Sequence, residues 1–121
     1  MFGHEKLTIY PKAIRFVALS YEISDDVERG YSKLLDQLHR AATSIALNIA
    51  EGSGKTSDPD RKRFYSIARG SAMECAAVLD ILLELQMIRE EQRNEGKELL
   101  LHVVNVLSKL VVGQQGTRAC V

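Results

Sequence analysis

Residues 32–51 read SKLLDQLHRAATSIALNIAE, and the spacing of their apolar residues is typical of an α-helix. Apolar side chains recur at steps of three and four residues, which places them on one stripe of an α-helix. The members of this stripe are Leu34, Leu35, Leu38, Ala41, Ala42, Ile45 and Ile49. Residues 41–46 are rich in small side chains, so a neighbouring helix can approach closely there. The glycines of Gly52-Ser53-Gly54 then stop the helix.

Three further segments show the same helical period. The stretch Ser57-Asp58-Pro59-Asp60 starts one of them, because Asp accepts free backbone N–H groups and Pro fits the first helical position. We predict helices over about 8–24, 31–51, 58–86 and 90–113, and a disordered tail over 114–121. Gly70 lies inside the third helix, where close backbone packing is the expected reason for a glycine. Together the segments predict a single all-α domain over residues 1–121, an antiparallel up-down-up-down four-helix bundle.

The fourth helix has more apolar surface than one buried side requires. Between Leu99 and Gly113, ten of fifteen residues are Leu or Val. A helix with one buried side needs about three apolar positions in every seven. We therefore expect this helix to be buried on two sides, with copies of the chain associating as a closed symmetric ring or dimer.

The overall composition excludes several classes of protein. The chain has 121 residues, 45% hydrophobic, and its 16 Lys and Arg balance 16 Asp and Glu, so the formal net charge is zero. Attraction to nucleic acid must therefore be local, because no overall positive field exists. No apolar stretch reaches the ~20 residues that a membrane-spanning helix needs. The first residues do not form a signal peptide, and Cys75 and Cys120 lie far apart, so we expect a reduced, cytoplasmic protein with no membrane partner.

A glycine-rich stretch, GSGKT over residues 52–56, resembles the end of a phosphate-binding P-loop. The full pattern needs another glycine five positions before Gly54, and Ile49 occupies that position inside a predicted helix. A P-loop also joins a strand to a helix, whereas a helix precedes this stretch. The sequence favours a flexible turn over a nucleotide site.

Metal and nucleophile patterns are also missing. The three histidines are scattered over separate segments at His4, His39 and His102, and neither cysteine has the spacing of a zinc ligand. Ser71 and Cys75 lie one turn apart with no histidine near them in sequence, which favours a core role. We expect no metal, no cofactor and no catalytic residue.

Four cations cluster near the turn between the second and third helices. They are Lys55, Arg61, Lys62 and Arg63, with Asp58 and Asp60 among them. Beside the free N–H groups at the start of the third helix, such a cluster can bind the phosphates of RNA or DNA. A solvated face with no ligand is the alternative, and the zero net charge favours it.

A set of polar residues adjoins the apolar stripes of the second and third helices. The set comprises Asn48, Glu51, Arg69, Ser71 and Glu74. Asn48 and Glu51 lie three residues apart and share a helix face. Counting from the turn does not settle whether Glu51 reaches Arg69. A structural network that fixes helix register is the favoured role, with catalysis as the alternative.

Two motifs run through this part of the chain, NIAEG over residues 48–52 and FxxIARGSxxE over residues 64–74. With them, and over most of its length, the chain resembles the bacterial four-helix-bundle family encoded in intervening sequences of 23S rRNA genes. The motif positions that the resemblance carries over are Asn48, Glu51, Gly52, Arg69, Gly70, Ser71 and Glu74.

The resemblance implies a left-handed bundle that assembles as a homopentameric ring, with no known enzymatic activity. It also implies kinship to the accessory variability determinant of diversity-generating retroelements, a basic pentamer that binds nucleic acid and a reverse transcriptase. This chain departs from that relative in being neutral. It also has Leu85-Gln86-Met87-Ile88 where the family often has a glycine before the fourth helix.

Two functions are therefore expected. The first is a non-enzymatic oligomeric bundle that binds RNA or DNA, or acts as a scaffold for a nucleic-acid enzyme such as a reverse transcriptase. The alternative is a structural protein–protein interaction module that binds no nucleic acid. In both, the chain's first partner is another copy of itself.

Overall fold

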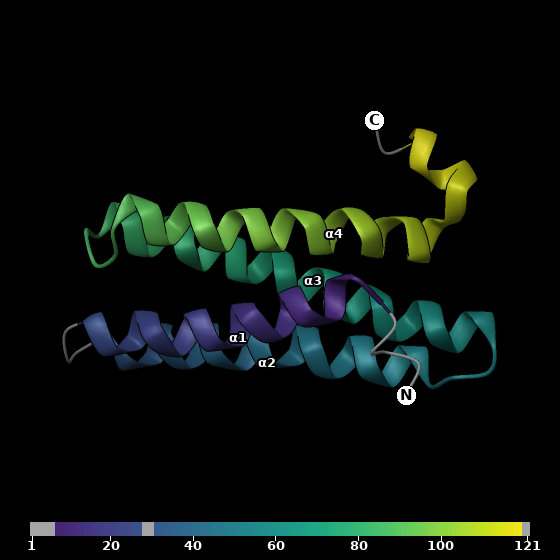
Figure 1. The fold of residues 1–121 in the computed structure, drawn as a ribbon, viewed down its shortest axis with the longest axis horizontal. Coiled ribbons are helices and arrows are strands. Elements are labelled where there is room, and N and C mark those ends of the chain that lie inside the picture. Colours follow the sequence, from purple (N-terminus) through teal and green to yellow (C-terminus); the bar gives the residue numbers. More distant parts are fainter. Residues whose placement is uncertain (1–6, 28–30, 120–121) are drawn as a thin grey trace.

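Four helices follow one another in the computed structural model, which describes residues 7–27 and 31–119. They are α1 (Ile9–Asp26), α2 (Ser32–Ser53), α3 (Asp58–Glu84) and α4 (Glu90–Ala119). α4 extends to Ala119, beyond the predicted helix end at about residue 113, while Cys120 and Val121 of the predicted tail lie outside the described residues. Residues after 113 lack periodic apolar side chains that could pack on the bundle, but their backbone can still form helical hydrogen bonds. Figure 1 shows this last segment bending away from the bundle.

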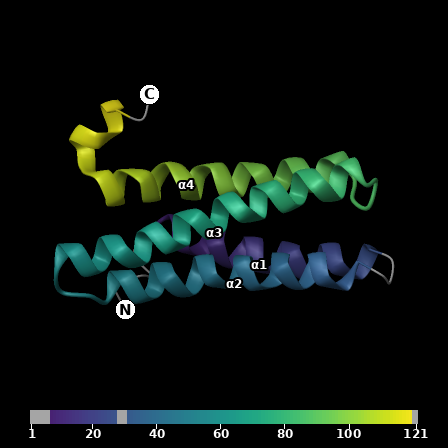
Figure 2. The same cartoon turned by 180° about the vertical axis from the view of Figure 1, so that it is seen from behind.

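The helices pack in the order of the chain. Each lies against the next, and α4 also lies against α1, whereas no Cα atoms of the diagonal pairs come within 8 Å of each other in the described residues. Consecutive helices run in opposite directions (Figure 1), consistent with an up-down bundle. Figures 1 and 2 show α3 crossing obliquely, beside α2 at one end and beside α4 at the other. The all-α fold class is thus as predicted.

The core lies between the four helices and receives apolar side chains from each. Its largest fully buried members include Phe16, Ile23, Leu38, Ile45, Ile49, Leu79, Leu82 and Leu107. Gly96 of α4 faces this core so closely that a Cβ atom there would lie 2.6 Å from Cδ1 of Leu79. Gly70 is different, because a Cβ atom there would meet nothing within 4 Å. The expectation of close packing at Gly70 is therefore wrong.

The turn from α3 to α4 uses a left-handed residue that is not glycine. Gln86 has a φ of 60°. Its N–H donates to the Leu83 carbonyl, and the Met87 N–H donates to the Leu82 carbonyl, both at 2.9 Å. This pair of bonds is the Schellman motif, whose left-handed position favours glycine. Gln86 thus adopts, at some conformational cost, the backbone expected of the missing glycine.

One side of α4 carries exposed apolar side chains. Leu100, Val103 and Leu107 are buried against the other helices. Leu101 stays 62% exposed and Val112 48% exposed. Some of the many Leu and Val side chains of this helix are therefore exposed to solvent. Within the described part of the chain, no helix has the length and apolar character needed to cross a membrane.

Candidate functional site

The turn between α2 and α3 is held by backbone and side-chain bonds on both sides. At the end of α2, the Gly54 and Lys55 N–H groups donate to the carbonyls of Glu51 and Gly52. The cap of α3 is Ser57, whose hydroxyl accepts from the Asp60 N–H at 3.3 Å. We expected an aspartate to cap this helix. The serine does so because it holds the extended backbone conformation typical of a cap, and Asp58 is already in the first turn.

Arg61 ties this turn together. Its guanidinium donates to the Lys55 carbonyl at 2.9 Å and also forms an ion pair with Asp58. Lys55 forms an ion pair with Glu51 at 3.1 Å, and its ammonium lies 5.2 Å from the centre of the Phe64 ring. Two of the four predicted phosphate-binding cations therefore have partners within the protein.

Lys62 and Arg63 are the more available cations of the cluster. Both side chains are exposed. The guanidinium carbon of Arg63 lies 4.5 Å from the centre of the Phe64 ring, and Arg63 makes no ion pair or hydrogen bond within the described residues. Lys62 makes no ion pair or hydrogen bond with any residue in the described ranges. Two available cations thus lie in the second turn of α3, close to the connection from α2.

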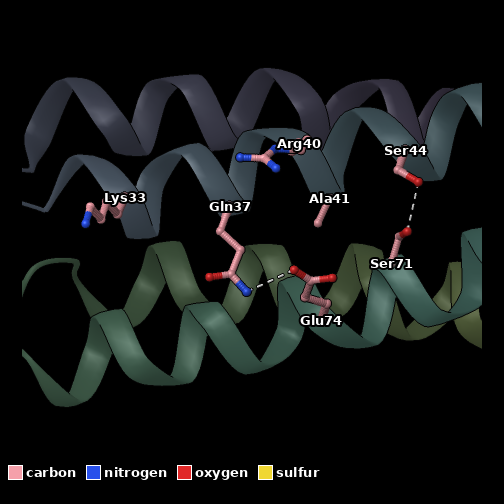
Figure 3. Close-up of a pocket in the computed structure, with 7 residues that line it drawn as sticks. All are labelled: Lys33, Gln37, Arg40, Ala41, Ser44, Ser71 and Glu74. Carbon is pink, nitrogen blue, oxygen red and sulfur yellow. Dashed lines mark hydrogen bonds between the residues drawn. The ribbon is translucent and has the colours of Figure 1, made fainter.

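A polar groove of about 610 Å³ runs between α2 and α3. Its lining comprises Lys33, Gln37, Arg40, Ala41, Ser44, Ser71 and Glu74 (Figure 3). Two bonds cross it: Gln37 Nε2 donates to Glu74 Oε2 at 3.0 Å, and the Ser71 hydroxyl donates to the Ser44 hydroxyl at 2.9 Å. These bonds give α2 and α3 a defined register, because each partner is fixed on its own helix.

The five residues of the predicted polar set do not form one network. Asn48 donates within α2 to the Ser44 carbonyl and hydroxyl, and Ser44 in turn accepts from Ser71. Arg69 faces α4, where its Nε donates to the Ser108 hydroxyl at 2.7 Å. Glu51 pairs with Lys55 instead of Arg69. The set therefore divides among three places: the α2–α3 groove, the α3–α4 contact and the α2–α3 turn.

The family model described as "23S rRNA-intervening sequence protein" matches residues 5–109. The chain belongs to this family. A comparison with curated proteins gave no match. In this member of the 23S rRNA-intervening sequence protein family, the motif glycine Gly52 is required sterically. A Cβ atom there would lie 2.8 Å from Cε1 of Tyr65 and 3.1 Å from Cβ of Phe64.

The glycine-rich stretch, the histidines and Cys75 form no metal site within the described residues of this family member. The GSGKT stretch begins inside α2, and Lys55 within it pairs with Glu51. No group of three or more His, Cys, Asp or Glu side chains that could hold a metal ion occurs among the described residues. Burial raises the pKa of Cys75 to about 12, with a smaller contribution from the Glu74 carboxylate, so its thiol stays protonated near neutral pH. His4 lies outside the described residues.

Sequence reasoning missed three polar partners and one aromatic pair. Gln37, Ser44 and Ser108 complete the bonds of Glu74, Ser71 and Arg69. The sequence signal for this role is that each lies at the polar edge of a helix. Many other residues share such positions, so this signal does not single them out. Tyr21 of α1 and His39 of α2 stack with ring centres 4.0 Å apart and planes at 10°. Pairing across helices depends on register, which periodicity does not give.

Proposed function

We propose that this family member is a non-enzymatic, oligomeric bundle that binds nucleic acid at the α2–α3 turn. The observation that supports it is the availability of Lys62 and Arg63, two exposed cations whose N–H donors are not used within the described residues. The turn itself is rigid, because Arg61 and the Ser57 cap hold it. A fixed pair of cations suits phosphate binding, which depends on charge more than on shape.

The charge of the bundle is divided between its ends. Near the α3–α4 turn, the last turns of α1 contribute Glu22, Asp25 and Asp26, and residues 16–27 contain no Lys or Arg. The first turn of α4 adds Glu90 and Glu91. The zero net charge thus conceals an acidic end, and the cations of the α2–α3 turn lie at the other end of the bundle (Figure 1). Because the two charges are separated, the cations of the turn can attract phosphate although the net charge of the chain is zero.

Self-association is the second part of the proposal. The exposed Leu101 and Val112 of α4 supply an uncovered apolar surface in the protomer. We take the assembly to be the homopentameric ring that the family resemblance implies. A closed ring repeats the cations of the turn around one axis, and repetition strengthens a field that one copy produces only weakly. Such a ring suits an accessory scaffold for a nucleic-acid enzyme, a reverse transcriptase among them.

The test is binding of a labelled RNA oligonucleotide at several salt concentrations, followed by fluorescence anisotropy. The double variant Lys62→Ala/Arg63→Ala should bind more weakly and lower the slope of log K against log salt by about 1.4 to 1.8, for two lost phosphate contacts. The matched control is Arg89→Ala/Lys97→Ala, which removes the same charge at the acidic end and should change binding little. Absence of binding at low salt, or equal losses in both variants, would reject the proposal.

The alternative function, a protein–protein interaction module, rests on a different observation. Leu47 is 62% exposed and Met73 is 52% exposed, on α2 and α3, in addition to Leu101 on α4. Large apolar side chains on several helices are typical of surfaces that a protein partner covers. Affinity capture from lysate of the source cells, with and without nuclease, separates the two functions. A partner retained after nuclease treatment, together with no RNA binding by the purified chain, would favour the module.

A further inference from the structure

A second hollow of about 610 Å³ lies on the other side of α2, against α1. It is lined by Tyr21, Asp36, His39, Arg40, Thr43, Ser44, Leu47 and Asn48. Arg40 and Ser44 also line the α2–α3 groove, so the two hollows adjoin across α2. Together the two hollows flank a strip of α2 that centres on Arg40 and Ser44, and Tyr21, His39 and Arg40 lie outside the basic turn.

An aromatic pair forms one wall of this hollow. Tyr21 is 52% exposed and stacks on His39, so one face of its ring meets the imidazole and the other is open. His39 is fixed in turn, because its Nε2 donates to the carbonyl oxygen of buried Ser20 at 3.1 Å. The open ring face of Tyr21 is thus held in place before any ligand arrives, which lowers the entropy lost on binding.

A cation lies beside the aromatic pair. Arg40 follows His39 in α2, is exposed, and forms no ion pair or hydrogen bond within residues 7–27 and 31–119. Asp36 is one helical turn away but does not pair with it. In Figure 3 the Arg40 guanidinium lies apart from the bonded Gln37 and Glu74 pair. Lys33, two turns before Arg40 on the same helix, is also exposed and unpaired among the described residues.

We propose that this strip of α2 binds single-stranded nucleic acid, with one base stacked on the open face of Tyr21 and the adjoining phosphate bound by Arg40. Stacking on an aromatic ring together with a nearby cation is how proteins hold single strands without reading their sequence. Bases in a duplex are already stacked on each other and cannot reach the ring. The proposal rests on the proposed function for its class of ligand, and adds a second contact surface and a preference for single strands.

The experiment uses a labelled oligouridylate and the same strand annealed to its complement, each bound to the 121-residue chain. Tyr21→Leu should weaken binding of the single strand by roughly 5- to 150-fold, which corresponds to the loss of one base–aromatic stack. It should leave binding of the duplex unchanged. Tyr21→Phe keeps the ring and should bind the single strand like the unaltered chain. Arg40→Gln should weaken single-strand binding and lower its salt dependence by about 0.7, the value for one phosphate.

A spectroscopic readout separates contact from indirect effects. The chain has four tyrosines and no tryptophan, so its fluorescence reports on tyrosine alone. Saturating single strand should quench the unaltered chain more than Tyr21→Leu. The matched control is Tyr10→Leu on the same helix. The single strand should quench the fluorescence of this variant by the same amount as that of the unaltered chain. Thermal melting of each variant shows that it is folded.

Two outcomes overturn the inference, and they are distinguishable from failure of the proposed function. If Tyr21→Leu binds the single strand as tightly as the unaltered chain while Lys62→Ala/Arg63→Ala binds weakly, the turn is the binding surface and the strip of α2 is not. If single strand and duplex lose equal affinity in Tyr21→Leu, the ring does not stack on a base. If the unaltered chain binds neither form at low salt, both proposals fail.

Discussion

Gly52 of α2 lies against the ring of Tyr65 on α3, and a Cβ atom at position 52 would come within 2.8 Å of Cε1. Tyr65 is buried and Phe64 closes the other side, so neither can move away freely. The two helices therefore approach closely beside the turn that carries the cations. This contact fixes where Lys62 and Arg63 lie relative to the end of α2.

Gly52→Ala should destabilise the protein, whereas Gly70→Ala should stabilise it. The added methyl group at position 52 overpacks the contact at a cost of about 1 to 3 kcal/mol. At position 70 the methyl meets nothing, and alanine gains up to about 1 kcal/mol over glycine within a helix. Urea unfolding followed by circular dichroism measures both. A Gly52→Ala variant as stable as Gly70→Ala would contradict the close contact.

Gln86→Gly should stabilise the turn before α4. Gln86 adopts the left-handed conformation, which costs an ordinary residue about 1 to 2 kcal/mol, and glycine recovers part of this while losing more chain entropy on folding. We expect a net gain of about 0.5 to 1 kcal/mol in the free energy of unfolding. Gln86→Ala is the control, since it keeps the strained conformation and should bring no such gain. Equal stability of the two variants would show that the backbone there is unstrained.

The Ser71 to Ser44 bond should appear as a coupling energy between α2 and α3. We expect a double-mutant cycle of Ser44→Ala and Ser71→Ala to give about 0.5 to 1.5 kcal/mol, typical of one intramolecular hydrogen bond. A cycle of Ser71→Ala with Ser108→Ala pairs residues that share no bond and should give a value near zero. Similar values in both cycles would assign the loss to general packing instead of this bond.

Asp80 should make stability depend on acid pH. A hydrogen bond from Lys97, with Arg93 beside it, holds the pKa of Asp80 below its usual value. As the pH falls, Asp80 therefore takes up a proton in the unfolded chain before it does so in the folded chain. The stability that the Asp80–Lys97 ion pair contributes is complete above the ordinary aspartate pKa of about 3.9. It is lost as the pH falls through the lower pKa of the folded state. Because the carboxylate is half exposed, the contribution is at most about 1 kcal/mol.

Comparison of Lys97→Met with the unaltered chain measures this effect. The difference in unfolding free energy should shrink between neutral pH and about pH 3. Lys109→Met removes an exposed charge that has no ion pair among the described residues, and its difference should not follow this pattern. A Lys97→Met difference that stays constant with pH would show that Asp80 titrates normally in the folded state.

Cys75 should be unreactive while the protein is folded. The side chain has no exposed surface, and burial raises the pKa of its thiol to about 12. In a Cys120→Ser background, reaction with a disulfide reagent at pH 8 should proceed only as fast as the chain unfolds. Concentrated guanidinium chloride should restore the rate of an ordinary thiol. Rapid reaction of the folded chain would mean that α3 opens locally.

Much of the architecture could be predicted from periodicity. The stripe from Leu34 to Ile49 is a helical face because apolar residues at steps of three and four share one side of a helix. The Asp58-Pro59 start was located correctly, although Ser57 is the cap. The extent of α4 was underestimated, since an apolar stripe marks where a helix packs and not where its backbone hydrogen bonds end.

The candidate site was predicted less well, for a physical reason. Composition and spacing identified the cations of the turn and the motif residues of α2 and α3. They did not show that Arg61 donates to the Lys55 carbonyl and forms an ion pair with Asp58, or that Arg69 donates to Ser108 on α4. Those assignments depend on the rotation of each helix about its own axis.

The amino-acid order alone thus gives the number of helices, their apolar faces and the family, since each depends on residues close together in the chain. Contacts between helices depend on how far each helix is shifted along its neighbour. Examples are the Tyr21–His39 stack, the Ser44–Ser71 hydrogen bond and the close approach of Tyr65 to Gly52. That register results from the combined packing of four helices. Local sequence cannot specify it, because shifting a helix by one turn preserves the same apolar stripe.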